Sequence, residues 1–206
     1  MNHYFTGNEN LKSELRVLKY SYLEYNFLFK SDLGVFSKDR IDTGSKTLVE
    51  TYFKHGQKNA KILDAGAGYG FVGITLAKVM GAFVDMIDIN ARSLHLCKQN
   101  IKDNSVIANV FESDVYEAVT EKYDCIITNP PIRAGKSVYM KFIIEAFDHL
   151  NKNGELWFVM RTNHGVKTVV KTLKETKNVK ILCKNNGFYV ISAKHAWHQR
   201  FDLLKF

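Results

Sequence analysis

From residue 61 onward, the sequence alternates between short apolar segments and longer amphipathic segments. The short segments predict strands over residues 61–63, 83–87, 106–111, 123–128 and 155–160. The amphipathic segments, whose apolar residues recur every three or four positions, predict helices over residues 71–79, 91–101, 136–150 and 166–176. Strands that alternate with helices pair in parallel, because each helix returns the chain to the same edge of the sheet. The sequence therefore predicts an α/β fold.

A β-hairpin is predicted at each end of the chain. Residues 17–30 alternate apolar and polar side chains on both sides of a turn near Glu24, and a helix is expected over residues 42–53. Strands over residues 179–183 and 188–193 flank an Asn-Asn-Gly turn signal. We expect a Rossmann-like sheet of seven strands that is mostly parallel, with an antiparallel last hairpin. We expect one domain over residues 1–206, with a hairpin extension over 1–40 and a core over 41–206.

Composition narrows the class of protein. With 206 residues, of which 46% are hydrophobic, the chain can bury a core without disulfides or metal. Its 29 Lys and Arg against 21 Asp and Glu give a net charge of +8, which favours an anionic partner, nucleic acid before membrane. No apolar run approaches the ~20 residues that span a bilayer, and the first residues lack the pattern of a secretory signal. We therefore expect a cytoplasmic protein without membrane association.

No metal site is expected. The three cysteines are scattered without a CxxC pair, and among the seven histidines the one short spacing is His195 to His198. The adjoining tail, with Trp197 and Arg200, suits either packing on the core or stacking on RNA. The lysines of the predicted helix at 166–176 are similarly open to two interpretations, a solvated face or an RNA-binding stripe.

A glycine-rich loop joins the strand at 61–63 to the helix at 71–79. Its key residues recur at every second position: Asp64, Gly66, Gly68 and Gly70. Glycines let the backbone approach a ligand and expose the amides of the helix N-terminus. Residues 68–73 also match GxGxxG, the pattern of dinucleotide-binding proteins. In that pattern, however, the first glycine follows the strand directly. Here Asp64 precedes Gly66 by two residues, and a carboxylate there disfavours a pyrophosphate and favours a cationic ligand with an amino acid moiety.

This D-x-G-x-G-x-G pattern resembles motif I of the class I S-adenosylmethionine-dependent methyltransferases. The resemblance implies that Asp64 and the glycine backbone hold the methionine end of the cofactor. Asp88, at the end of the next strand and about 20 residues after the glycines, is placed to accept the ribose hydroxyls. The family also has an acid after its third strand, which implies that Asp114 accepts from the adenine amine and that the Val115 N–H meets the ring. Capping a helix is the other role open to Asp114.

A proline-rich tetrapeptide, Asn129-Pro130-Pro131-Ile132, follows the strand at 123–128, at the sheet edge where α/β proteins bind ligands. Two prolines fix the backbone and remove two N–H donors. The Asn129 side-chain oxygen and the Pro130 carbonyl can therefore accept both hydrogens of an exocyclic NH2, which localises the nitrogen lone pair for attack on a methyl group. The tetrapeptide resembles the D/N/S-P-P-aromatic motif of amino-group methyltransferases, with Ile132 in place of the aromatic residue.

Two longer strings narrow the resemblance. Residues 34–45 (GVFSKDRIDTGS) and 129–136 (NPPIRAGK) resemble the ribosomal RNA small-subunit methyltransferase C family, which methylates guanine N2 in 16S rRNA. The likeness starts at residues 3–5 and covers nearly the whole chain, although longer members carry a second, degenerate domain that has no match here. It implies S-adenosylmethionine as cofactor and ribosomal RNA or the small ribosomal subunit as partner.

The same resemblance gives four residues a role near the substrate. Phe36 and Ser37 are expected in a loop over the cofactor or the target base, and ordinary packing of the hairpin is the alternative. Arg133 and Lys136 border the catalytic tetrapeptide and are placed to bind phosphates, or else form a solvated helix start.

Other functions stay open. The reaction could instead methylate adenine N6 or a protein glutamine, or the fold could be a vestigial one in a non-catalytic RNA-binding assembly protein. Intact Asp64, Asn129, Pro130 and Pro131 oppose that last reading. A nicotinamide-dependent oxidoreductase would have no use for the Asn-Pro-Pro sequence.

Overall fold

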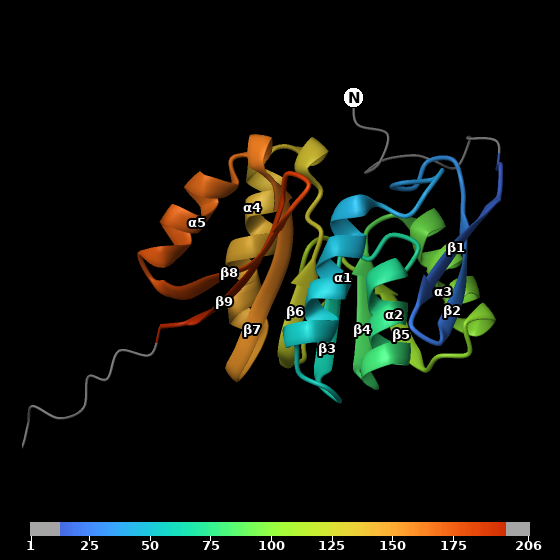
Figure 1. Cartoon of the computed structure of the whole chain (residues 1–206), viewed down its shortest axis with the longest axis horizontal. Helices are drawn as coiled ribbons and strands as arrows, with labels where there is room; N and C mark the ends of the chain where they lie inside the picture. The colour runs from blue at the N-terminus through green and yellow to red at the C-terminus, as the bar shows by residue number, and fades with distance from the viewer. Residues whose placement is uncertain (1–12, 197–206) are drawn as a thin grey trace, which may run out of the picture.

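The computed structural model describes residues 13–196, so the expectations for residues 3–5, Trp197, His198 and Arg200 lie outside the described residues. Within this range the central sheet has seven strands in the order β5-β4-β3-β6-β7-β9-β8 (Figure 1). The strands are β3 Lys61–Ala65, β4 Phe83–Asp88, β5 Ala108–Glu112, β6 Tyr123–Thr128, β7 Leu150–Arg161, β8 Lys177–Asn185 and β9 Phe188–His195. Strands β3 to β7 pair in parallel, and β9 runs antiparallel to β7 and β8. The predicted α/β fold and its antiparallel last hairpin are confirmed.

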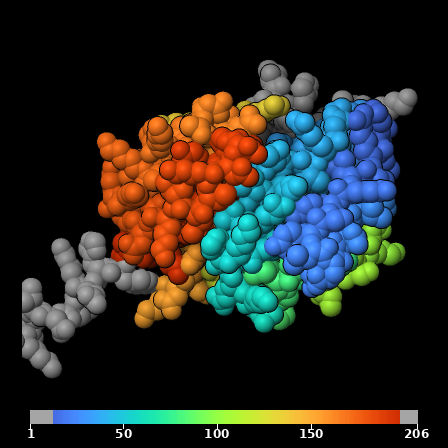
Figure 2. Space-filling view, in the orientation of Figure 1, coloured from blue at the N-terminus to red at the C-terminus, as the bar shows by residue number. Residues whose placement is uncertain are grey.

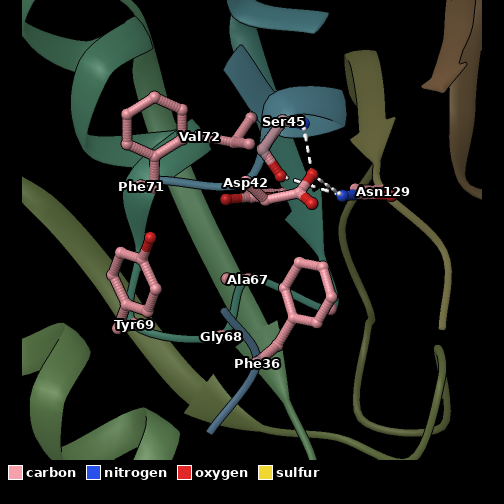
Figure 3. Close-up of a pocket in the computed structure, with 11 residues that line it drawn as sticks. Phe36, Asp42, Ser45, Ala67, Gly68, Tyr69, Phe71, Val72 and Asn129 are labelled. Atoms are coloured by element: carbon pink, nitrogen blue, oxygen red, sulfur yellow. Dashed lines mark hydrogen bonds between the residues drawn. The ribbon is translucent and has the colours of Figure 1, made fainter. Parts of the chain in front are cut away.

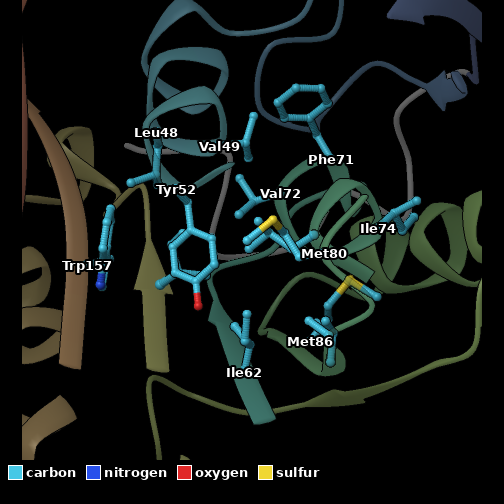
Figure 4. Close-up of a cluster of buried hydrophobic side chains, with 14 of the residues drawn as sticks. Leu48, Val49, Tyr52, Ile62, Phe71, Val72, Ile74, Met80, Met86 and Trp157 are labelled. Carbon is cyan, nitrogen blue, oxygen red and sulfur yellow. The ribbon is translucent and has the colours of Figure 1, made fainter. Parts of the chain in front are cut away.

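Helices cover both faces of this sheet. They are α1 Thr43–His55, α2 Phe71–Met80, α3 Ala91–Asp103, α4 Lys136–Ile144 and α5 Val166–Lys174. Successive side chains of a strand point to opposite faces, so Ile62 packs in the core under α1 and α2, whereas Leu63 packs in the core under α4 and α5. In the first core the Tyr52 ring meets Trp157 edge-on, with ring centroids 4.8 Å apart (Figure 4).

The predicted N-terminal hairpin forms a separate two-stranded sheet of β1 (Arg16–Tyr22) and β2 (Tyr25–Ser31). Its inner aromatic side chains pack on α2, because the rings of Tyr20 and Phe29 lie 5.1 and 5.3 Å from that of Phe71. Figure 2 shows the hairpin beside α1 on one face of the molecule. The extension therefore shares the core of the central sheet.

Some predicted boundaries are wrong. The helix predicted over 136–150 ends at Ile144, and tighter 3₁₀ turns (η3, Glu145–His149) close it. Strand β7 begins at Leu150 rather than at residue 155, so the polar residues 151–154 belong to it. A side chain at Gly154 would lie 2.8 Å from the Tyr123 carbonyl, so glycine lets β7 pass close to β6 where their register shifts. Strand β5 covers 108–112 instead of 106–111.

The topology brings the predicted site residues to one edge. Strand β3 lies between β4 and β6, and all three run parallel. Asp64 lies near the carboxyl end of β3, Asp88 ends β4, and Asn129 directly follows β6. Because parallel strands end at the same edge, these three side chains meet where α/β proteins bind their ligands. No helix within residues 13–196 is long and apolar enough to cross a membrane.

Candidate functional site

The glycine loop is held to the end of β4 by backbone amides. The N–H groups of Gly66 and Ala67 both donate to the Ile87 carbonyl at 2.9 Å, and the Gly68 N–H donates to Asp88 Oδ2 at 2.8 Å. A side chain at Gly68 would meet nothing within 4 Å, so the φ of +58°, rather than crowding, favours glycine there. This open side of the loop leaves room for a ligand against the backbone.

Gly70 has a structural role. It is the N-cap of α2 with a φ of +91°, and a side chain there would lie 2.7 Å from Cys97 Sγ and 2.9 Å from Ile74 Cδ1. It lines neither of the two cavities of the site. The last glycine of the predicted motif therefore lets the chain enter α2 against the core.

Asp64 is a buried carboxylate beside the glycine loop, with 1% of its surface exposed. Its Oδ2 accepts the Gly73 N–H at 2.8 Å. Burial, with a smaller contribution from the nearby Asp88, raises the pKa of Asp64 to about 7, although the Gly73 hydrogen bond opposes the shift. A cationic ligand beside Asp64 would stabilise the ionised form.

Asp88 closes the loop from the β4 side. Its Oδ1 accepts the Asn90 N–H and its Oδ2 accepts the Gly68 N–H, both at 2.8 Å. Burial raises the pKa of the Asp88 carboxyl, while these backbone bonds lower it. Each oxygen of an ionised carboxylate can accept a further hydrogen bond, so Asp88 can hold the loop and a ligand hydroxyl together.

The turn after β5 presents Asp114 and Val115. Asp114 is exposed and Val115 is buried, and both line the larger cavity. Val115 has a φ of +50°, a left-handed conformation that is strained for a β-branched residue. The Ser113 hydroxyl donates to the Val115 carbonyl at 3.1 Å and accepts the Ala118 N–H, which holds this turn in place.

The Asn129 amide is fixed by two residues of α1's start. Its Nδ2 donates to Asp42 Oδ2 and to Ser45 Oγ, each at 2.9 Å (Figure 3). A carboxylate only accepts hydrogen bonds, so Asp42 fixes which end of the amide faces it. Among the described residues no group donates to Asn129 Oδ1, which is left to accept from a ligand.

The two prolines lead into a short 3₁₀ turn, η2 (Ile132–Ala134), where the Ala134 N–H donates to the Pro131 carbonyl.

Sequence reasoning missed Asp42 and Ser45 as parts of the site. Asp42 caps α1 by accepting the Ser45 N–H at 2.8 Å, and the Asp-x-x-Ser spacing signals that helix start. The bond to Asn129 joins residues 87 positions apart in the chain. No local pattern carries that information.

Two adjoining cavities hold most of the predicted residues. The larger has a volume of about 710 Å³, within the range of pockets that enclose a small ligand. It is lined by these predicted residues: Phe36, Gly66, Gly68, Asp88, Asp114, Val115, Asn129, Pro130, Pro131, Ile132 and Arg133. Asp64 lines the smaller cavity together with Phe36, the glycine loop and Asn129 (Figure 3).

Two of the predicted substrate residues lie outside both cavities. Ser37 has a φ of +54° and its hydroxyl donates to the Arg40 carbonyl at 2.5 Å, so it shapes the turn that carries Phe36. Lys136 is the exposed first residue of α4. No cluster of three or more His, Cys, Asp or Glu side chains within residues 13–196 could hold a metal ion.

Cationic side chains border the larger cavity. Arg40, Arg133 and Arg161 line it beside His164, and the Arg161 guanidinium lies over the Phe188 ring at 4.7 Å. Burial lowers the pKa of His164, and the charges of Arg161 and Arg133 lower it further. This part of the cavity wall therefore suits an anionic ligand.

The described residues fit S-adenosylmethionine. Asp64 offers a buried carboxylate for a cationic amino acid moiety, and Gly68 leaves the backbone open to close approach. Asp88 lines the larger cavity as a hydrogen-bond acceptor that hydroxyls such as those of a ribose could use, and Asn129 lines both cavities. This cofactor supplies a methyl group activated by a sulfonium.

Comparisons with known proteins agree with this fit. The methyltransferase small domain family matches residues 26–192. The protein YbxB of Bacillus subtilis (strain 168) is 34% identical over 197 residues, which cover 93% of this chain and 98% of that protein. The ribosomal RNA small subunit methyltransferase C of Buchnera aphidicola subsp. Cinara cedri is 37% identical over 82% of this chain and 50% of that protein.

A solved structure shows the same arrangement. The T. thermophilus 16S rRNA N2 methyltransferase (RsmC), in complex with AdoMet and guanosine, superposes with a TM-score of 0.80 at 27% identity. The match covers 90% of this chain and 52% of that one, so this chain spans about half the length of its relatives named methyltransferase C. The chain belongs to the methyltransferase small domain family, and the residues of its site fit S-adenosylmethionine.

Proposed function

We propose that the protein methylates the exocyclic N2 of a guanine in 16S ribosomal RNA. The orientation of Asn129 carries this proposal. With Nδ2 held by Asp42 and Ser45, Oδ1 is the atom presented to a ligand, and it can accept one amine hydrogen. The Pro130 carbonyl has no N–H donor of its own residue beside it, and Pro130 lines the same cavity, so this carbonyl would accept the second amine hydrogen.

These two acceptors prepare the amine for transfer. Two hydrogen bonds from the NH2 hydrogens draw the nitrogen toward tetrahedral geometry, so its lone pair is no longer shared with the ring. As the N–C bond forms, the bond between the methyl group and the sulfonium sulfur would break and leave a neutral thioether. The positive charge then passes to the nitrogen, where the Asn129 oxygen and the Asp42 carboxylate behind it would stabilise it. The nitrogen then releases its extra proton to solvent, so the site needs no strong base.

The walls of the cavity favour a flat base. Phe36 is 46% exposed although it is aromatic, and it lines both cavities. Ile132 and Phe188 add apolar surface to the larger one. We infer that Phe36 supplies the ring contact that an aromatic residue gives at the fourth position of the Asn-Pro-Pro motif, where this chain has Ile132.

The test uses isotope-labelled S-adenosylmethionine with undermethylated small ribosomal subunits or free 16S rRNA, followed by mass spectrometry of the nucleosides. We expect label in N2-methylguanosine from the wild type and none from Asn129→Ala. Label in methyladenosine would keep an amine as the acceptor and overturn guanine. No label in either RNA, from protein that binds the cofactor, would overturn RNA as the substrate.

A further inference from the structure

Positive charge is concentrated in one region of the chain. Residues 161–196 carry eight Lys and Arg side chains and a single acid, Glu175, whereas the whole chain has 29 basic and 21 acidic residues. This region comprises α5, β8 and β9, which lie at one end of the sheet (Figure 1). The excess charge therefore belongs to one end of the molecule.

Helix α5 presents a row of lysines to solvent. Its apolar face is buried through Val166, Val169, Val170 and Leu173. Lys167, Lys171 and Lys174 on the other face are exposed, and no ion pair within residues 13–196 involves them. Like charges four residues apart on a helix repel, at a cost of about 0.2–0.5 kcal/mol per pair. An anionic partner would remove this repulsion.

The row of lysines leads to the cavity. The 3₁₀ turn η4 (Thr162–His164) joins the end of β7 to α5, so Lys167 follows His164 by three residues. Arg161 lines the cavity from this side, and Arg133 lines it from the catalytic loop. Cationic groups thus continue from the surface of α5 to the wall of the site.

We propose that α5 is a docking surface for RNA, with Lys167, Lys171 and Lys174 contacting phosphates of the strand whose target base enters the cavity. This inference rests on the proposed function. A polyanionic strand fits because a linear row of unpaired cations ends at a base-sized cavity with cations in its wall. Phosphate contacts of this kind fix the position of the strand, while the cavity selects the base.

The test compares two double variants of equal charge. Lys167→Gln/Lys171→Gln removes two lysines from α5, and Lys98→Gln/Lys102→Gln removes two with the same spacing from α3. Helix α3 lies toward the other end of the sheet, and Lys98 and Lys102 are also exposed (Figure 1). Affinity for a 16S rRNA fragment is measured over a range of salt concentrations, with cofactor affinity and methyl transfer measured on the same samples.

We expect the α5 variant to bind RNA at least about tenfold more weakly. The slope of log K for RNA binding against log salt concentration should become shallower by roughly 1.4, because two phosphate contacts are lost. Its cofactor affinity should not change, and the α3 variant should match the wild type. Equal RNA affinity in the two variants would overturn the docking surface. Poly-glutamate is added as a competitor. If it displaces RNA from the wild type at an equal concentration, the partner of α5 is an acidic protein and not RNA.

The same samples separate this inference from the proposed function. If the wild type binds RNA through α5 but transfers no label, guanine methylation fails and the docking surface stands. If the wild type methylates RNA and both double variants behave alike, the docking surface fails and the proposed function stands.

Discussion

Asn129 and Asp42 lie 87 residues apart in the chain, yet Asn129 Nδ2 donates to Asp42 Oδ2 at 2.9 Å. The same carboxylate oxygen accepts the Ser45 N–H at 2.8 Å and so caps α1. One oxygen thus fixes both the start of a helix and the orientation of the proposed catalytic amide. The hydrogen bond joins the N-terminal part of the chain to the loop after β6, so the site depends on how these segments pack together.

Asn129→Ala is expected to separate cofactor binding from transfer. We propose that Asn129 contacts the amine, whereas Asp64 and the glycine loop would hold the cofactor. We expect cofactor affinity within about twofold of the wild type and a transfer rate lower by at least about 10²-fold, the usual effect of removing one transition-state hydrogen bond. Calorimetric titration with the cofactor and single-turnover transfer assays measure the two quantities. Near wild-type transfer would contradict the mechanism.

Ser45→Ala tests whether the anchoring of Asn129 matters. The variant removes one of two bonds to Asn129 Nδ2, so we expect kcat to fall roughly fivefold, as for about 1 kcal/mol, with KM for the cofactor unchanged. Thr51→Val is the matched control, because the Thr51 hydroxyl donates to the Thr47 carbonyl at 2.7 Å on the same helix and neither residue lines a cavity of the site. Both variants should lose similar stability in urea unfolding. Equal kcat values for the two would show that Ser45 acts only on folding.

Cofactor binding is expected to weaken as the pH falls below 7. Burial raises the pKa of Asp64 to about 7, far above the usual value of 3.8. Protonation below pH 7 removes the negative charge that a cationic ligand needs, so Kd should rise toward tenfold per pH unit. The wild type should also release protons on binding near pH 7, which calorimetry in two buffers of different ionisation enthalpy detects. Asp64→Asn should bind weakly at every pH, and a wild-type Kd that stays constant between pH 6 and 8 would refute the role of Asp64.

The same raised pKa affects the free protein. Because folded Asp64 holds its proton more tightly than the unfolded chain does, stability from this carboxyl is present at low pH and is lost as the pH rises from about 4 to about 7. The cofactor should therefore increase the free energy of unfolding more at pH 8 than at pH 6.

The sequence predicts the parts of the site that depend on local patterns. The Asp64 to Gly70 repeat lies between a strand and a helix as expected, and the periodicity of the segments gives the order of strands and helices. Lys136 is near the catalytic loop in sequence, but as the first residue of α4 it lies outside both cavities. Asp42 reaches the site through a long-range hydrogen bond, and such a pairing has no periodicity that a single sequence could reveal.

Local sequence patterns also do not predict how the N-terminal hairpin is attached to the rest of the fold. The backbone of β2 is hydrogen-bonded on its free side by two asparagine side chains, that of Asn100 in α3 and that of Asn104, the C-cap of α3. Asn100 Oδ1 and Nδ2 bond to the N–H and carbonyl of Lys30, and Asn104 bonds to those of Leu28 in the same way. Each amide replaces one residue of a missing neighbouring strand. Both asparagines are buried, with 0% and 3% exposed.

This pair of asparagines provides the last prediction. Each side chain makes three hydrogen bonds, but only Asn100 reaches the glycine loop, by donating to the Tyr69 carbonyl at 2.8 Å, whereas the third bond of Asn104 goes to the Asn100 carbonyl within α3. Asn100→Ala and Asn104→Ala should each lower the free energy of unfolding by about 2–3 kcal/mol, since buried backbone groups lose their partners.

The two variants should differ in cofactor binding. Asn100→Ala frees the Tyr69 carbonyl next to Gly68 and Gly70, so we expect about fivefold weaker cofactor binding, while Asn104→Ala should bind as the wild type does, because one lost hydrogen bond is worth about 1 kcal/mol. Urea unfolding and cofactor titration at a temperature where both variants are folded measure the two effects. Equal cofactor affinities in the two variants would mean that Asn100 holds the hairpin without shaping the loop.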